Sequence, residues 1–238
     1  MFPIHDENPV QIIPYVTYTF MAVCIGVFLW QITHSPGEQN DIVYALGVTP
    51  AVIFDYQDLP PNLVWIPEYL TVFTSMFLHG GWMHLIGNML YLRVFGNNIE
   101  NAMGHVRFVL FYFICGVAAV LAQALPDTDS VIPMIGASGA ISGVLGAYLL
   151  LYPQKQVTLI VPIVIIIKTF KVPAMYVLAG WFVMQLVSSA LARGQGGGGV
   201  AFGAHIGGFI AGMVLVAFFT KKGVSLKIPF VHFHPWKS

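Results

Sequence analysis

A serine and a histidine in two separate apolar segments are the residues best suited to carry out chemistry. Ser138 lies in the stretch MIGASGAISGVLGAY, and His205 lies in GAHIGGFIAG. A serine hydroxyl becomes a good nucleophile when an adjacent base removes its proton, and His205 is the base that the chain offers. The outer parts of the apolar segments contain no Asp or Glu. The pattern therefore predicts a Ser–His dyad rather than a triad.

Acyl transfer by such a dyad also needs hydrogen-bond donors for the oxyanion that develops. His84 and Asn88 in HGGWMHLIGN are four residues apart, so on a helix they lie about 40° apart on one face. With the backbone N–H of Ser138 they form the candidate oxyanion hole. His79 lies about 140° from His84 on such a helix, so we expect it to point away, towards the outer loop. For His84 or Asn88 alone, an interhelical hydrogen bond is an alternative explanation.

The composition shows what kind of elements must position these residues. The chain is 57% hydrophobic and only 8% charged, with a mean hydropathy of +0.78, whereas soluble domains are about one quarter charged. It therefore predicts an integral membrane protein. The net charge is zero, so the sequence shows no excess of positive charge that would indicate nucleic-acid binding. Cys24 and Cys115 lie in apolar runs and predict neither a disulfide framework nor a metal cluster.

Six segments are long and apolar enough to cross a bilayer, which takes about 20 mostly apolar residues. They are roughly 14–33, 80–99, 105–125, 135–152, 174–192 and 199–219. The acidic N-terminus and the absence of a small-residue cleavage site predict that the first segment is a retained span and not a signal peptide. The β-branched run 157–167 is shorter and contains Pro162, so we expect an interfacial or re-entrant connection.

The positive charges predict the orientation of these spans. The first loop, 34–79, contains acidic residues and no Lys or Arg. The basic residues that flank the other spans lie on the opposite side, apart from Arg193: they are Arg107, Lys155, Lys168, Lys171, Lys221, Lys222, Lys227 and Lys237. The positive-inside rule then predicts cytoplasmic termini and an outer first loop. The second, fourth and sixth spans all enter from outside and bring the candidate residues to a similar depth, about 10 Å in for Ser138.

Glycine pairs four residues apart occur on the two segments that carry the dyad. They are Gly139 and Gly143 on the fourth, and Gly208 and Gly212 on the sixth. Such small-xxx-small faces let two helix backbones approach closely. We expect this approach to bring His205 within hydrogen-bond reach of Ser138.

Taken together, these motifs resemble the rhomboid family of intramembrane serine proteases, in its prokaryotic form. The resemblance covers about residues 14–219 and rests on HGGWMHLIGN, GASG and AHIGGFIAG, in that order. Gly96, Glu100 and Gly104 also match the glycine–glutamate–glycine spacing of the family.

The resemblance implies an all-α bundle of six transmembrane helices, with a long outer loop between the first two. It implies a cytoplasmic N-terminus at 1–13, a membrane-embedded protease domain at 14–220 and a basic, aromatic cytoplasmic tail at 221–238. For activity, it implies hydrolysis of peptide bonds in or near transmembrane segments of protein substrates, in the lipid bilayer of a cell membrane, with no metal, cofactor or nucleic acid.

The resemblance also assigns roles to residues. Ser138 is the nucleophile, His205 the base and later the acid, and His84 and Asn88 line the oxyanion hole. The supporting residues are His79 and Glu100, which brace the first loop, and the glycines Gly136, Gly139, Gly143, Gly208 and Gly212. The segment 174–192 corresponds to the lateral gate. Some family members carry an aromatic residue four positions after the serine; here it is Ser142, so what orients His205 stays open.

Two other classes of function remain as alternatives. One is an inactive relative that binds or escorts membrane proteins, although such a relative is expected to have lost the serine or the histidine. The other is a transporter or a metal site built from His79, His84 and His205. No HExxH motif or acidic or cysteine ligand accompanies these histidines, and a transporter leaves GASG unexplained. For the HFHPW segment of the tail, a solvated or interfacial position is favoured over a metal site.

Overall fold

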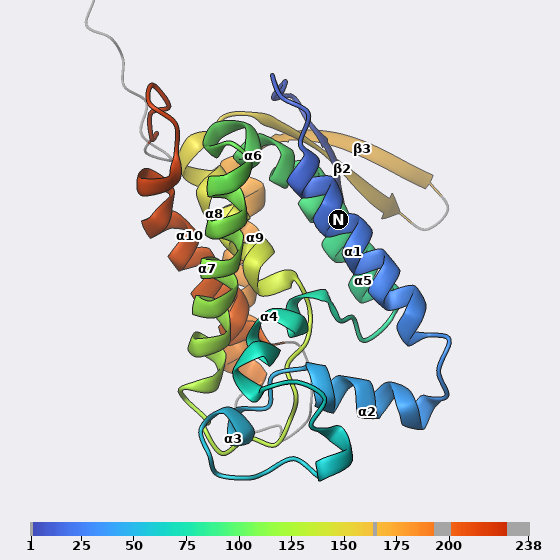
Figure 1. The fold of residues 1–238 in the computed structure, drawn as a ribbon. Coiled ribbons are helices and arrows are strands. Elements are labelled where there is room, and N and C mark those ends of the chain that lie inside the picture. The colour runs from blue at the N-terminus through green and yellow to red at the C-terminus, as the bar shows by residue number, and fades with distance from the viewer. Residues whose placement is uncertain (1, 164–165, 193–200, 228–238) are drawn as a thin grey trace, which may run out of the picture.

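The computed structural model describes residues 2–163, 166–192 and 201–227, which form a mostly helical bundle with a small sheet at one end (Figure 1). Among these residues, three helices are long and apolar enough to cross a membrane. They are α7 (His105–Ala124), α9 (Ala174–Ala192) and α10 (Phe202–Phe219). Two shorter apolar helices, α1 (Tyr15–Gln31) and α8 (Ser138–Leu151), pack into the same bundle. The apolar helices agree with the predicted membrane protein, and the count of six spans stays a prediction.

The segment predicted as the second span is one continuous helical run with a local change in winding. It consists of α5 (Trp82–Tyr91), the π-helical stretch η4 (Leu92–Gly96) and α6 (Asn97–Met103). A Cβ at Gly96 would lie 3.2 Å from the Thr17 side chain, so the missing side chain lets α1 approach this run. The run ends at Gly104, whose φ of 84° is readily adopted only by glycine.

The first loop is folded into short helices and lies at the opposite end of the bundle from the sheet (Figure 1). These are α2 (Pro36–Leu46), α3 (Pro50–Ile53), η1 (Pro61–Leu63), η2 (Glu68–Leu70), α4 (Thr71–Thr74) and η3 (Ser75–Phe77). Val48 and Met134 exchange backbone hydrogen bonds of 3.0 and 2.7 Å, and the N–H of Gly136 donates to Ser75 O at 2.8 Å. The loop is therefore attached to the segment that leads directly into α8.

A three-stranded antiparallel sheet corrects the prediction of an all-α fold. Strands β1 (Phe2–Asp6), β2 (Gln156–Ile163) and β3 (Ile166–Pro173) lie in the order β1-β2-β3. The all-α class was therefore wrong in this part, because 157–167 contributes most of β2 and the start of β3, where we predicted no strand. The interfacial position of this segment stays a prediction. Alternate residues Val157 and Leu159 are buried, which is the period of a strand. Pro162 lies beyond the part of β2 that β1 pairs, where a missing N–H is tolerated.

The N-terminal strand is fixed to the bundle by a buried carboxylate. Asp6 is 5% exposed and accepts hydrogen bonds from the Tyr148 hydroxyl at 2.6 Å and the Asn98 Nδ2 at 2.8 Å. Burial raises the pKa of Asp6 above its ordinary value, although the bond from Tyr148 acts in the opposite direction. At the adjoining surface, Lys171 on β3 forms an ion pair with Glu7. Segment 1–13, predicted as a simple terminus, thus contains a strand that joins the sheet to α8 and α6.

Some predicted features lie outside the described residues. The last span was predicted to begin at 199, and the described helix begins at Phe202. Arg193, which was assigned to the outer side, and most of the tail predicted at 221–238, including HFHPW, also fall outside.

Candidate active site

Ser138 and His205 form a hydrogen-bonded pair across two helices. Ser138 is the first residue of α8, and His205 lies in the first turn of α10. The Nε2 atom of His205 is 2.8 Å from the Ser138 Oγ atom. His205 is buried, at 9% exposure, whereas Ser138 is half-buried. This arrangement places a base within proton-transfer distance of a hydroxyl that is still partly accessible.

Gly139 and Gly143 on α8 and Gly208 and Gly212 on α10 let these helices pack backbone to backbone. A Cβ at Gly208 would lie 2.1 Å from the carbonyl oxygen of Gly139, and a Cβ at Gly212 would lie 1.9 Å from that of Gly143. Both distances are far below van der Waals contact, so no side chain fits at either position. The contact continues along the two helices from the end at which Ser138 and His205 meet.

The turn before Ser138 is shaped by Gly136. Its φ of 121° lies in a region that residues with a side chain rarely adopt. A Cβ there would also lie 2.6 Å from Nε2 of His84. Gly136 therefore permits both the turn into α8 and the close approach of the His84 ring to it.

Asn88 supplies a buried donor on α5. The residue is 7% exposed, and among the described residues its Nδ2 atom has no hydrogen-bond acceptor. A buried donor without an acceptor costs free energy, and such groups in native proteins call for an explanation. An oxyanion that exists only during a reaction would accept from it.

His79 lies closer to His84 than we predicted. The two rings are 5.2 Å apart and edge to face, because α5 begins only at Trp82 and His79 is not on the helix. The prediction that His79 points away from His84 was therefore wrong. The backbone N–H of His79 donates to the Gln31 Oε1 at 3.1 Å. Since Gln31 ends α1 and His79 precedes α5, this bond ties together the two ends of the first loop.

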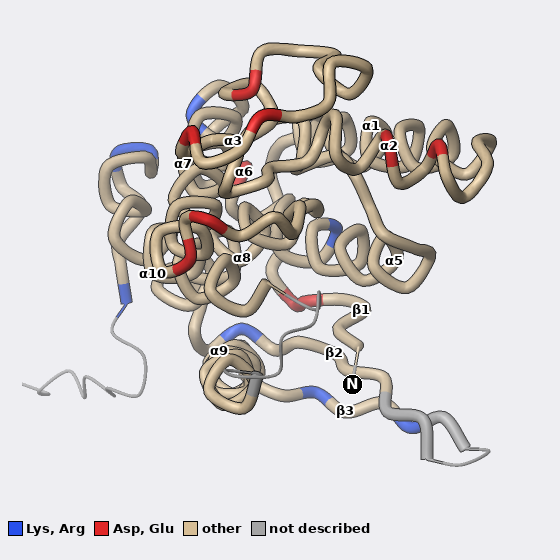
Figure 2. Tube along the Cα trace, turned by 90° about the horizontal axis from the view of Figure 1, so that it is seen from below, with Lys and Arg blue, Asp and Glu red and all other residues tan. Residues whose placement is uncertain are grey.

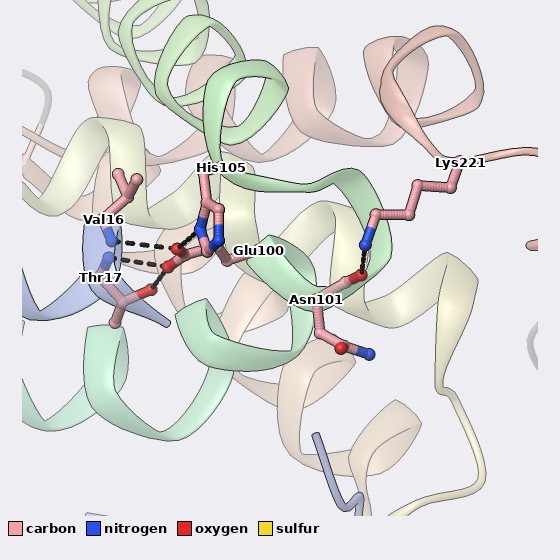
Figure 3. Close-up of polar contacts among 6 residues, drawn as sticks. All are labelled: Val16, Thr17, Glu100, Asn101, His105 and Lys221. Atoms are coloured by element: carbon pink, nitrogen blue, oxygen red, sulfur yellow. Dashed lines mark hydrogen bonds and ion pairs between the residues drawn. The ribbon is translucent and has the colours of Figure 1, made fainter. Parts of the chain in front are cut away.

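Glu100 stabilises the start of α1 and not the first loop (Figure 3). Its carboxylate accepts from the backbone N–H groups of Val16 and Thr17 at 3.0 and 2.8 Å, and from the Thr17 hydroxyl at 2.7 Å. His105 Nδ1 lies 2.6 Å from the same carboxylate. α1 has no side-chain N-cap of its own, so Glu100 satisfies its exposed N–H groups. The first loop leaves α1 at its other end, so the predicted contact with this loop was wrong.

A residue that the sequence reasoning missed faces the other nitrogen of His205. Gln185 on α9 places its Oε1 2.9 Å from His205 Nδ1 and is only 5% exposed. The Trp181 ring, one turn earlier on α9, lies 5.8 Å from the His205 ring. Ser142 donates instead to the backbone oxygen of Ser138 at 2.6 Å. The signal for Gln185 was one amide inside the apolar run WFVMQLV.

The metal site considered as an alternative has no matching cluster of side chains among the described residues. Among the described residues, no group of three or more His, Cys, Asp or Glu side chains is arranged to hold a metal ion.

Comparison with known proteins shows which family this chain is similar to. The rhomboid domain family matches residues 67–222. RHOMBOID-like protein 5 of Arabidopsis thaliana is 30% identical over 194 residues, which cover 79% of this chain and 55% of that protein. Rhomboid protein 1, mitochondrial, of Saccharomyces cerevisiae is 28% identical over 209 residues, covering 81% and 57%. Rhomboid protease GluP of Bacillus subtilis is 31% identical over 136 residues, covering 57% and 24%.

The chain spans little more than half the length of the first two relatives and about a quarter of the third. The matched region begins near the end of the first loop and extends past α10, which is well over half of the chain. It contains Ser138, His205, His84, Asn88 and Gln185. The chain belongs to the rhomboid family.

Proposed function

We propose that this chain is an intramembrane serine endopeptidase that cleaves peptide bonds in or near transmembrane segments of membrane-protein substrates. The observation that carries the proposal is the 2.8 Å contact between Ser138 Oγ and His205 Nε2 within a bundle of apolar helices. Family membership supports it, since rhomboids are generally intramembrane serine proteases and one relative is named a protease.

The chemistry follows from the pair. Ser138 Oγ attacks the carbonyl carbon of the scissile bond while its proton passes to His205 Nε2. His205 then gives this proton to the departing amine nitrogen, so the C–N bond breaks and an acyl-enzyme ester remains on Ser138. A water molecule next attacks the ester, with His205 accepting its proton. Transfer of that proton back to Ser138 Oγ releases the carboxylic acid product and restores the pair.

The oxyanion that forms in each attack needs donors beside Ser138. The Asn88 Nδ2 atom has no acceptor among the described residues, and the His84 ring lies against the turn that leads into α8. Ser138 begins α8, where backbone N–H groups have no intrahelical acceptor and the helix dipole favours negative charge. One such donor typically contributes about 10²- to 10³-fold in rate.

Substrate access is proposed to occur beside α9. Of the three candidate spans, α9 has the smallest buried share, 22% against 33% for α7 and α10. A transmembrane substrate must also unwind before attack, because every backbone carbonyl in a membrane helix is otherwise hydrogen-bonded. We therefore propose substrates with small residues at the cut and helix-weakening residues beyond it.

We propose six spans within residues 14–220: α1, the run from α5 to α6, α7, α8, α9 and α10. Acidic residues lie along α2 and near α3, whereas Lys155 directly precedes β2 and Lys168 and Lys171 lie on β3 (Figure 2). By the positive-inside rule, this separation favours a cytoplasmic sheet and an outer first loop. The proposed location is a cell membrane. Named relatives include mitochondrial and chloroplastic proteins, so fractionation of the native cell is the direct check.

A fluorescent fluorophosphonate tests the proposed function without knowledge of the substrate. The purified protein in detergent is treated beside Ser138→Ala and His205→Ala. Ser142→Ala serves as the matched control, since it removes a hydroxyl one turn further along α8. We expect labelling of the wild type and the control and none of the other two. A folded wild type labelled no more than Ser138→Ala would favour the inactive, escorting alternative.

A further inference from the structure

The hydrogen bond between Gln185 and His205 joins two helices through buried polar atoms. Gln185 is 5% exposed, whereas its neighbours Met184 and Leu186 are 53% and 44% exposed. Gln185 therefore points inward from the most exposed of the three candidate spans. Burying an amide is costly unless it is hydrogen-bonded, and here the bond to His205 Nδ1 at 2.9 Å compensates for the burial.

We propose that Gln185 is the positioning residue for His205, holding its ring in the tautomer that can accept a proton from Ser138. This inference rests on the proposed protease function. If Nδ1 carries the proton, it donates to Gln185 Oε1, and Nε2 presents a lone pair to the Ser138 hydroxyl. The opposite tautomer would set the Nδ1 lone pair against an amide oxygen and direct an N–H at the nucleophile.

Gln185 also matches what the base needs after it accepts the proton. The protonated ring carries N–H groups at both nitrogens, and the amide oxygen then accepts a charge-assisted hydrogen bond, which is stronger than a neutral one. In a Ser–His–Asp triad, a carboxylate performs this task. Here the neutral amide of Gln185 lies at that position. It orients the ring without burying a second charge.

The other neighbours of His205 do not fulfil this role. The Ser142 hydroxyl is bonded to the backbone oxygen of Ser138, and the Trp181 ring is tilted 38° to the imidazole and offers it a face rather than an acceptor. Among the described residues, the hydrogen bonds of the His205 ring go to Ser138 and Gln185. Because Gln185 belongs to α9, movement of α9 away from α10 would release the ring.

The test compares Gln185→Met, which keeps the length of the side chain but removes the acceptor, with Gln185→Glu, which retains an acceptor. Leu186→Met is the matched control, because it introduces the same side chain at an exposed neighbouring position of α9. The rate of fluorophosphonate labelling is measured against pH for each. Ring tautomers are measured by ¹⁵N NMR on histidine-labelled protein, with the His205 signals assigned by their loss in His205→Ala.

We expect Gln185→Met to label about 10- to 100-fold more slowly, the range seen when a group that orients a metal-bound histidine is lost. Gln185→Glu should keep most of the activity, with the acid limb of its pH profile moved to higher pH because a carboxylate stabilises the protonated ring. The other titratable group that acts on His205 electrostatically is His84, which is unchanged in all variants. The control should behave as the wild type.

The NMR spectrum separates failure of this inference from failure of the proposed function. In the wild type, Nδ1 should carry the proton and Nε2 should not, and Gln185→Met should mix the tautomers, whether or not the protein labels. A wild-type ring protonated at Nε2, or a Gln185→Met ring with unchanged tautomer and unchanged labelling rate, would overturn the inference. Absence of Ser138-dependent labelling with the expected tautomers would count against the protease function alone.

Discussion

Replacing Gly208 by alanine should separate Ser138 from His205 without changing any atom of either residue. The added Cβ would lie 2.1 Å from the backbone oxygen of Gly139, and ordinary contact begins at 3.4 Å, so the two helices must move apart by about 1.3 Å. Neither partner is a flexible side chain that can turn away. Such overpacking typically costs about 1–3 kcal/mol of stability.

The effect on catalysis follows from the same displacement. If it is transmitted to the ends of α8 and α10, the Ser138–His205 distance grows from 2.8 Å to about 4 Å, beyond hydrogen-bond range. A misplacement of about 1 Å costs on the order of 10²-fold in rate. We therefore expect Gly208→Ala to react with a fluorophosphonate about 100-fold more slowly than the wild type, and to melt at a lower temperature in detergent.

The control is a glycine with open space around it. Gly26 on α1 has no atom within 4 Å of an added Cβ, so Gly26→Ala should keep the labelling rate of the wild type and should melt at the same or a slightly higher temperature, because alanine favours a helix. Labelling of Gly208→Ala as fast as that of Gly26→Ala would refute the idea that direct backbone contact aligns the dyad.

Three further predictions concern other parts of the structure. Asn88→Ala removes a donor that has no acceptor among the described residues and should lower the labelling rate by about 10²- to 10³-fold with little change in melting temperature; an unchanged rate would exclude Asn88 from the proposed oxyanion hole. Glu100→Gln replaces the carboxylate that caps α1 and should lower the free energy of unfolding by about 1–3 kcal/mol, measured by denaturant titration, while Ser138 still labels. The pKa of Asp6 is raised by burial, so the folded protein holds this proton more tightly than the unfolded chain. Stability from Asp6 should be fully present below the ordinary pKa of 3.8 and decline as pH rises through the raised value. The melting temperature of the wild type relative to Asp6→Asn should follow this course, and the opposite slope would contradict it.

The meeting of Ser138 and His205 could be predicted from the sequence because polar residues are rare in apolar segments. Ser138, His205 and the glycine pairs stand out against such a background, and helical periodicity places each on a face. Periodicity within one helix does not give the rotation of a neighbouring helix. The sequence therefore shows Gln185 only as one amide in an apolar run, and it does not show that His205 is the hydrogen-bond partner.

The sheet was missed for a different reason. The run 157–167 was judged by its length and apolar character, which do not distinguish a strand from an interfacial segment. Its pairing with Phe2–Asp6 joins residues more than 150 positions apart, which local patterns do not contain, whereas Ile166–Pro173 pairs with it in a local hairpin.

The prediction for His79 was wrong because it assumed that His79 lies on a helix, and the prediction for Glu100 was wrong because it relied on the family resemblance. His79 lies before the first residue of α5, so its direction could not be obtained by counting 100° per residue. Glu100 was assigned to the outer loop by resemblance, whereas its carboxylate contacts residues at the far end of α1.

The central claim is that Ser138 and His205 hydrolyse a peptide bond within the membrane, and the most direct measurement is the formation of new C-termini. Wild type and Ser138→Ala are reconstituted in liposomes with single-span reporters that carry small residues followed by helix-weakening residues. The reaction is run in ¹⁸O-water, and the products are identified by mass spectrometry. We predict wild-type products cut in or beside the span, with ¹⁸O in the new carboxyl group and no such products from Ser138→Ala. Equal products from both proteins, or intact reporters with a wild type whose Ser138 reacts with a fluorophosphonate, would contradict the claim.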